Sequence, residues 1–205
     1  MNNQLDLQGN VTDILFVEKS TINYVNKGLS IHNHGSNNQI HIGRNVTFAN
    51  FNIRINCNDS KIFIGDDCRL TGTVIMKLAD KNQLSIGNGT SIGGANFICG
   101  EGKSITIGED CMIAWGIEFR NTDSHAIFDL ASKQRINHAN DIVIGNHVWI
   151  GAHSVILKGT HIKDGSVIAI KSLVNSSFEN KNIIIGGVPA KELKHNIFWE
   201  RPLLG

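Results

Sequence analysis

The stretch IVIGNHVWIGAHSVILKGTHIKDGSVIAIKSLV, residues 142–174, decides the fold of this chain. An aliphatic residue recurs in it at every sixth position, at Ile144, Ile150, Ile156, Ile162, Ile168 and Val174. A period of six fits neither the 3.6-residue turn of an α-helix nor the two-residue alternation of a simple strand. It is typical of a parallel β-helix, in which one aliphatic side chain per short flat face points inward and a small residue turns the corner.

A longer repeat extends this pattern towards the N-terminus. A phrase of the type Ile-x-Ile-Gly, once with Leu at the first position, occurs at 40–43, 62–65, 84–87, 105–108 and 142–145. The glycines that end these phrases are 22, 22, 21 and 37 residues apart. Three faces close one coil of about 18 residues, and coils stack about 4.8 Å apart, like hydrogen-bonded strands. The spacing therefore predicts coils with small excursions, roughly seven of them between residues 29 and 188.

The composition agrees with this architecture and argues against other classes. The 205 residues include 30 Ile, 24 Asn and 21 Gly but only 2 Pro, which favours short strands and tight corners over a helical bundle. A formal net charge of +1 indicates no nucleic-acid-binding surface. Residues 1–28 contain no long apolar run, so we expect neither a signal peptide nor a membrane span. The cysteines lack close CxxC spacing, which predicts buried, reduced thiols in a cytoplasmic protein, at Cys57, Cys68, Cys99 and Cys111.

Three parts of the chain follow from the repeat. We expect an N-terminal cap segment over residues 1–28, a β-helix over 29–188, and a C-terminal helix and tail over 189–205. The helix is predicted to begin at Pro189, because the missing N–H of proline costs little in the first turn of a helix. A terminal helix would cover the open end of the stack and protect its edge.

The gap of 37 residues marks an insertion. The six-residue period continues up to this gap at Ile107, Ile113, Phe119 and His125, and it is then lost until Ile142. Residues 126–141 are therefore predicted to leave the β-helix as a long loop, and long loops in compact domains are more often functional than decorative. His125 lies where the coil opens. A neutral imidazole there suits a general base, although the same position also suits a hydrogen-bonded corner histidine.

Three segments carry a resemblance to a known family: RNTDSH at 120–125, the stretch 142–168 quoted above, and GGVPAK at 186–191. They resemble the hexapeptide-repeat acyltransferases that use acetyl-CoA, and most of all the O-acetyltransferases of bacterial capsular polysaccharide, including sialic-acid capsules. The resemblance covers about residues 108–200 and implies the left-handed form of the parallel β-helix; the general rule for crossovers favours the right-handed form. It also implies acetyl transfer to a carbohydrate hydroxyl by a homotrimer with active sites between its subunits.

The resemblance assigns two catalytic positions. His125 matches the family's catalytic base, and Trp149 matches a tryptophan in the family's active site. His125 would take the proton of the sugar hydroxyl as its oxygen attacks the thioester, and would return the proton to the CoA thiolate. Backbone N–H groups or Trp149 Nε1 would stabilise the oxyanion. Asp123 or a backbone carbonyl would hold the second imidazole nitrogen.

Acetyl-CoA needs a second subsite, which the family places in a groove between neighbouring subunits. The expected contacts lie along the coil backbone of the C-terminal third, at Trp149, Gly151, Ala152, Lys158, Ala169, Lys171, Pro189 and Lys191. The lysines, together with Lys194, are candidates for the phosphates, which attract cations. Family members often have a small residue where Lys171 stands. Arg135 and His138 in the loop are candidates for contact with the acceptor or with an adjacent subunit.

Other functions fit parts of the sequence. A metal enzyme like the γ-class carbonic anhydrases would use several of the nine histidines, but no two are five residues apart. His147 and His153 are six apart, on adjacent faces, which suits poorly a zinc ion about 2.0–2.1 Å from each nitrogen, so we expect no metal. A structural or carbohydrate-binding solenoid would explain the repeat but not a loop that opens at His125. An acetyltransferase of the same fold acting on a nucleotide-sugar amine, serine or a small xenobiotic is the third alternative.

Overall fold

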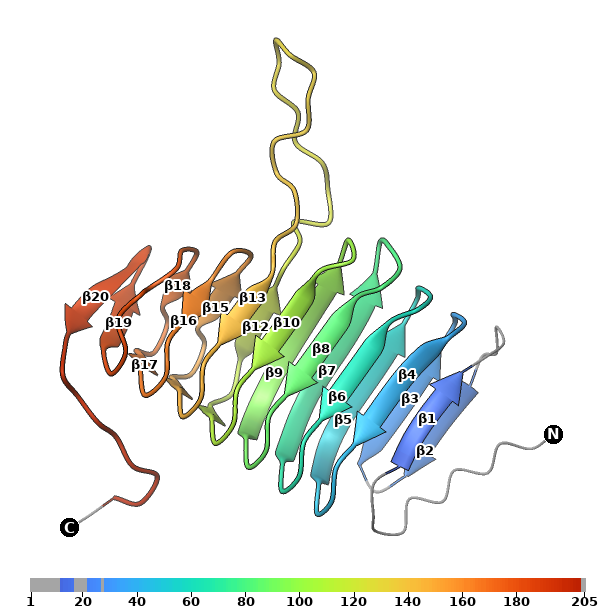
Figure 1. The fold of residues 1–205 in the computed structure, drawn as a ribbon, viewed down its shortest axis with the longest axis horizontal. Helices are drawn as coiled ribbons and strands as arrows, with labels where there is room; N and C mark the ends of the chain where they lie inside the picture. Colours follow the sequence, from blue (N-terminus) through green and yellow to red (C-terminus); the bar gives the residue numbers. More distant parts are fainter. Residues whose placement is uncertain (1–11, 17–21, 27, 204–205) are drawn as a thin grey trace.

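The computed structural model describes residues 12–16, 22–26 and 28–203. Within these residues the chain forms twenty strands and no helix, and hence no helix that could cross a membrane. The strands wind into a parallel β-solenoid of about seven turns, stacked along one axis (Figure 1). The predicted β-helix is therefore confirmed.

One flat face of the solenoid is a seven-stranded sheet. In pairing order its strands are β1 (Thr12–Phe16), β4 (Asn38–Ile42), β6 (Lys61–Ile64), β8 (Gln83–Ile86), β10 (Ser104–Ile107), β13 (Ile142–Ile144) and β16 (His161–Ile162). From β4 onward these strands are parallel, and the register pairs Ile62 with Leu84 and Leu84 with Ile105. All three side chains are buried, so each coil places an aliphatic residue on the one before it.

The other two faces belong to a thirteen-stranded sheet. Its main row contains β2 (Ile22–Asn26), β3 (Leu29–Asn33), β5 (Thr47–Ile55), β7 (Arg69–Lys77), β9 (Ser91–Gly100), β11 (Met112–Ile113), β14 (Trp149–Ile150), β17 (Val167–Ile168), β19 (Ile184–Gly187) and β20 (Ala190–Lys194). The third face continues as β12 (Ile117–Arg120), β15 (Val155–Leu157) and β18 (Leu173–Val174). The long strand β9 joins the two faces, since its start pairs with β11 and its middle with β12.

The core is a column of inward side chains. The six positions that set the sequence period, from Ile144 to Val174, are each at most 2% exposed. Full burial of such a side chain is worth about 1.5–3 kcal/mol, and the solenoid repeats that gain in every coil. Two central coils also contribute aromatic side chains to the core, with the rings of Phe97 and Phe119 stacked 4.9 Å apart.

One corner of the solenoid requires residues that tolerate a left-handed backbone. In seven successive coils the residue at the corner after the first sheet has a left-handed backbone, with φ between 51° and 68°, at Asn45, Asp67, Gly89, Asp110, His147, Gly165 and Asn182. From Asp67 onward, the N–H of each of them donates to a carbonyl of the preceding coil. Gly, Asn and Asp tolerate this conformation best. His147 does not belong to that group, and its side chain has a separate role described below.

Antiparallel strands lie at both ends of the stack. β2 pairs with β3 and β1 with β4, while residues 1–11, 17–21 and 27 of the expected cap segment lie outside the described residues. At the other end, the prediction of a helix from Pro189 is wrong, because residues 190–194 form β20 antiparallel to β19. Gly187, with φ of 108°, reverses the chain. A strand can pair with the open N–H and C=O groups of the last coil, and a helix cannot.

The insertion projects from one edge of the solenoid between β12 and β13 (Figure 1). It is an irregular hairpin, in which Phe128 forms an antiparallel bridge with Arg135 and the N–H of Ile136 donates to the carbonyl of Ile127 at 2.9 Å. The two ends of the hairpin return to the same edge, so residues 121–125 lie next to the residues that lead into β13.

Candidate active site

The break in the solenoid puts His125 at the root of the inserted loop, a few residues after β12 ends. Its side chain is exposed, and within the described residues the imidazole makes no hydrogen bond or ion pair. Its backbone is held firmly, because Asn137 Nδ2 donates to the His125 carbonyl at 2.8 Å. Ser124, with φ of 65°, turns the chain just before it. The structure thus presents an open imidazole on a fixed backbone.

Asn137 joins the two sides of the loop at this root. Its side chain is 9% exposed, and Nδ2 also donates to Asp123 Oδ2 at 2.7 Å. Its Oδ1 accepts a hydrogen bond from the N–H of Ile127 at 2.6 Å. Nothing in the sequence distinguishes Asn137 from the other asparagines of the chain, because its role depends on how the two loop ends meet.

Two ion pairs flank Asn137. Lys158 Nζ lies 2.5 Å from Asp123 Oδ2, and Arg135 Nη1 lies 2.6 Å from Glu101 Oε2. The Lys158 ammonium holds the pKa of Asp123 below its usual range, and the Arg135 guanidinium lowers the pKa of Glu101 to about 2. Both carboxylates are therefore charged at neutral pH, and both pairs tie the loop to the solenoid.

The structure gives these predicted residues other partners than those expected. Asp123 directs its carboxylate to Lys158 and Asn137 and makes no hydrogen bond to the His125 imidazole among the described residues. Arg135, a candidate for acceptor contact, is paired with Glu101. His138, the other loop candidate, is exposed to solvent.

Trp149 lies on a different face from His125. It belongs to β14, which pairs with β11 and β17, whereas His125 follows β12, which pairs with β9 and β15. The indole is 38% exposed. A single chain therefore does not bring the two predicted catalytic side chains together.

The C-terminal tail packs against the solenoid beside Trp149 and forms with it a wall that consists of Trp199, His147 and Arg201. The Trp199 ring is 8% exposed, stacks on His147 with centroids 4.1 Å apart, and lies 6.1 Å from the Trp149 ring. Trp199 Nε1 donates to the His147 carbonyl at 3.0 Å, and the His147 ring nitrogens lie 3.0 Å from the Trp199 carbonyl and 2.7 Å from Asp110 Oδ2. Arg201 binds the same Asp110 at 3.0 Å. The sequence pattern gave no indication of this tail contact.

Four of the predicted acetyl-CoA contacts come together. They line a second corner of the solenoid in two successive coils, as Gly151 and Ala152, then Ala169 and Lys171. Pro189 lies beyond the next coil, in the turn between β19 and β20. The coils are close here, since a Cβ on Gly151 would lie 2.6 Å from the backbone nitrogen of Ile170. Lys191 is exposed on β20 nearby in sequence, whereas Lys158 lies at the loop root and not at this corner.

The two histidines considered as zinc ligands contact other side chains. His147 contacts Asp110 and Trp199, as described above. The His153 ring meets the Trp115 ring edge-on, with centroids 6.5 Å apart. All four cysteines are buried free thiols, as expected.

Two of the exposed apolar groups lie near the residues described above. One is the loop tip, defined here as Ile127, Phe128, Leu130 and Ile136, with exposures from 55% to 84%. The other is the apolar corner, defined as Trp115, Ile170 and Val188, with exposures from 62% to 72%. The apolar corner adjoins the predicted acetyl-CoA contacts, since Ile170 lies between Ala169 and Lys171.

Comparison with known proteins gives close matches. The chain is 41% identical over 169 residues to the polysialic acid O-acetyltransferase of Neisseria meningitidis, covering 82% of this chain and 78% of the relative. It matches the crystal structure of the polysialic acid O-acetyltransferase OatWY with a TM-score of 0.79 and 36% identity, covering 88% of this chain and 87% of the other. A hexapeptide-repeat acetyltransferase of Vibrio cholerae complexed with acetyl-CoA matches with a TM-score of 0.52 and 25% identity, covering 65% and 70%. No family model matches the chain. The left-handed β-helix expected from the resemblance is confirmed by these structures.

Proposed function

Because this chain belongs to the hexapeptide-repeat acetyltransferases, and among them to the polysialic acid O-acetyltransferases, we propose that it transfers the acetyl group of acetyl-CoA to a hydroxyl of a capsular polysialic acid. The chain is thus an acetyl-CoA-dependent acyltransferase. The observation that carries the proposal is the exposed His125 imidazole on a backbone clamped by Asn137.

His125 is the general base of the proposed reaction. Its imidazole removes the proton of the sugar hydroxyl, and the oxygen forms a bond to the thioester carbonyl carbon. As the resulting tetrahedral oxyanion collapses, the carbon–sulfur bond breaks and the imidazolium gives its proton to the departing thiolate. A fixed backbone favours this role because a base must stay within hydrogen-bond reach of the proton it takes.

The proposed site is completed by a second copy of the chain in a homotrimer. Two observations support it: His125 and Trp149 lie on different faces of one chain, and both the loop tip and the apolar corner are exposed. Docking the loop of one copy near the apolar corner of the next would cover both apolar surfaces. It would also bring His125 of one copy towards Trp149 of its neighbour, whose Nε1 or nearby backbone N–H groups would stabilise the oxyanion.

We place the CoA moiety along the corner formed by Gly151, Ala152, Ala169 and Lys171, continuing past Pro189 to Lys191. The small residues leave no long side chain of their own between the corner and the amide-rich arm, and the lysines supply charge for the phosphates. Lys158 is better assigned to the loop root, since its ammonium is neutralised by Asp123. We also place the protein in the cytoplasm, because its four cysteines are free thiols, the state that a reducing compartment maintains.

The experiment is an acceptor panel. Purified protein is incubated with acetyl-CoA and, separately, with polysialic acid, free sialic acid, a galactoside and chloramphenicol. Release of CoA thiol is measured in each reaction, and O-acetyl groups on the product are located by mass spectrometry. We expect O-acetylated polysialic acid and much slower thiol release with the other three. Faster turnover of chloramphenicol or the galactoside would contradict the proposed acceptor, and an absence of thiol release with all four would contradict the proposed activity.

A further inference from the structure

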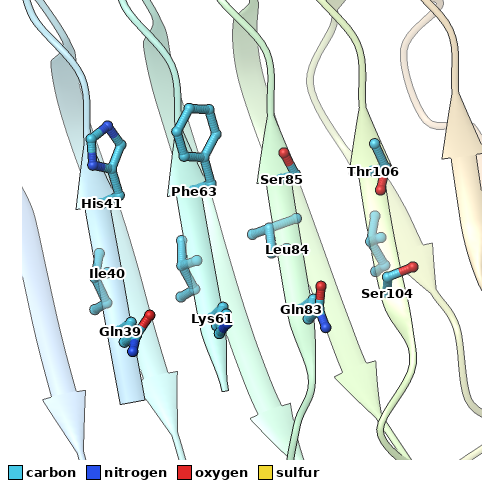
Figure 2. Close-up of a pocket in the computed structure, with 12 residues that line it drawn as sticks. Gln39, Ile40, His41, Lys61, Phe63, Gln83, Leu84, Ser85, Ser104 and Thr106 are labelled. Carbon is cyan, nitrogen blue, oxygen red and sulfur yellow. The ribbon is translucent and has the colours of Figure 1, made fainter. Parts of the chain in front are cut away.

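A groove of about 540 Å³ crosses the outer surface of the first sheet, far along the sequence from the residues of the proposed active site (Figure 2). It is lined by outward side chains of β4, β6, β8 and β10, which alternate with the buried aliphatic residues of the same strands. Two rows run across the strands. One row contains Gln39, Lys61, Gln83 and Ser104, and the other contains His41, Phe63, Ser85 and Thr106.

The groove is hollow because side-chain size falls along the second row. The His41 and Phe63 rings stack with centroids 4.8 Å apart and planes 3° apart, and the next two coils have only Ser85 and Thr106 at that position (Figure 2). The stacked rings therefore border a lower stretch of the same row, where only hydroxyl groups project. Four coils at about 4.8 Å spacing give the groove a length of about 14 Å.

The lining suits an anionic saccharide. A partly exposed aromatic face, such as Phe63 at 44%, packs against the C–H face of a sugar ring, while Gln39 and Gln83 offer amide donors and acceptors to its hydroxyls. Lys61 supplies a positive charge for a sugar carboxylate, and no lining residue is acidic. A neutral or cationic ligand would make less use of this charge.

The groove ends next to the place where the loop returns. β10, its last strand, pairs with β13, which begins directly after the loop. Asp141 Oδ1, at the end of the loop, accepts hydrogen bonds from the N–H and Oγ of Ser104 at 2.7 Å and 2.9 Å. A polymer lying across the four coils would therefore continue towards the root of the loop, where His125 is exposed.

We infer that this groove is a distal binding site for an acidic polysaccharide. The groove holds one segment of the polymer while a hydroxyl of another segment is acetylated in the active site that contains His125. The inference rests on the proposed function. It gives the N-terminal coils a role in polymer recognition that is separate from acetyl transfer, and it predicts that long acceptors are used better than short ones.

The first test compares long and short acceptors. Phe63→Ala, Lys61→Gln and Ser85→Trp, which fills the hollow without removing a wall, should each raise the KM for polysialic acid about tenfold, the factor given by about 1.4 kcal/mol. The kcat should not change, and kinetics with a sialic acid dimer should be unaffected. Arg54→Gln is the matched control, since Arg54 is an exposed cation on β5 outside the groove. An unchanged KM for the polymer in all three groove variants would overturn the inference.

The second test measures polymer binding without acetyl-CoA, by calorimetry with polysialic acid and with dextran as a neutral polymer. We expect the wild type to bind polysialic acid and not dextran, and each groove variant to bind it about tenfold more weakly. This readout does not require turnover, so it remains informative if the wild type acetylates a different acceptor and the proposed function fails. Equal binding by wild type and variants, or a change of oligomeric mass in the groove variants, would overturn the inference; the second result would identify this face as a contact between copies.

Discussion

Two segments leave the regular solenoid, and they are attached to it in different ways. The inserted loop is fixed only at its root, by Asn137 and the Glu101–Arg135 and Asp123–Lys158 pairs, and its apolar tip projects into solvent. The C-terminal tail is packed on the coils through the buried Trp199 ring, which stacks on His147. Arg201 extends this contact to Asp110 and Ser91.

The difference indicates which half of the proposed active site one chain completes by itself. The tail contacts beside Trp149 are all made within the chain, so this wall is formed before any assembly. The loop carries His125 but leaves four apolar residues without cover. We therefore expect the Trp149 side to depend on folding alone and the His125 side to depend on a second copy as well.

The largest effect should come from His125→Ala. Loss of a general base lowers kcat by about 10²–10⁴-fold. Because the side chain makes no hydrogen bond among the described residues, the melting temperature and oligomeric mass should be those of the wild type. His161→Ala, which removes an exposed imidazole from β16 on another face, is the control and should retain full activity. Near-normal turnover by His125→Ala would contradict the proposed mechanism.

Leu130→Asp tests whether the loop tip needs a partner. A charge at this 84%-exposed position would be buried without a counter-ion if the tip docks on a second copy, which is strongly unfavourable. We expect monomers by light scattering and a loss of activity in proportion to dissociation. Leu203→Asp makes the same change at a fully exposed residue of the tail and should leave the proposed trimer intact. A trimeric, active Leu130→Asp protein would show that the tip is free in the assembly.

Asn137→Ala should loosen the root of the loop. The Asp123 carboxylate, the His125 carbonyl and the Ile127 N–H each lose a partner, and a typical hydrogen bond is worth about 0.5–1.5 kcal/mol. We expect faster hydrogen exchange over residues 126–141 and a lower kcat, with little change in the KM for acetyl-CoA. Asn175→Ala, at an exposed asparagine, is the control. Unchanged exchange in the loop would mean that the two ion pairs suffice to hold it.

Trp199→Ala should affect the C-terminal tail and the Trp149 side of the proposed site. Loss of an aromatic contact worth about 0.5–1.5 kcal/mol beside Trp149 should raise the KM for acetyl-CoA about two- to tenfold and shift Trp149 fluorescence to longer wavelength. The proposed trimer should persist, because the tail is attached within one chain. Phe198→Ala, at the exposed neighbouring residue, should change neither quantity. A wild-type KM in Trp199→Ala would remove the tail from the site.

The smallest effect, a partial loss of loop protection, is expected when the pH is lowered. The pKa of Glu101 is lowered from 4.5 to about 2 in the folded protein. The stabilisation of the loop by the ionised Glu101 carboxylate is therefore complete above about pH 4.5 and is lost as the pH falls towards 2. Protection of residues 126–141 from hydrogen exchange, corrected for intrinsic rates, should therefore decrease over that interval. Glu101→Gln should show the reduced protection already at pH 6. An identical pH profile for this variant and the wild type would exclude Glu101 as the acid-sensitive contact.

Much of the solenoid was predictable because its rule is local. Each inward aliphatic residue is followed six positions later by the next, so the column from Ile144 to Val174 could be read directly from the chain. The break at His125 was visible for the same reason. The end of the stack was less predictable: Pro189 is compatible with a helix start, but the open edge of the last coil favoured a strand at 190–194.

The sequence by itself determined the coils, the position of the insertion and the corners rich in Asn and Gly, because these depend on residues close together in the chain. Only the tertiary structure decided the partners of Asp123, Arg135 and Lys158, and the packing of the tail. Those contacts join residues that are far apart in the sequence. Arg201 and Ser91, for example, are separated by 110 positions. Their energies depend on distance and burial in space, and a local periodicity contains no information about either.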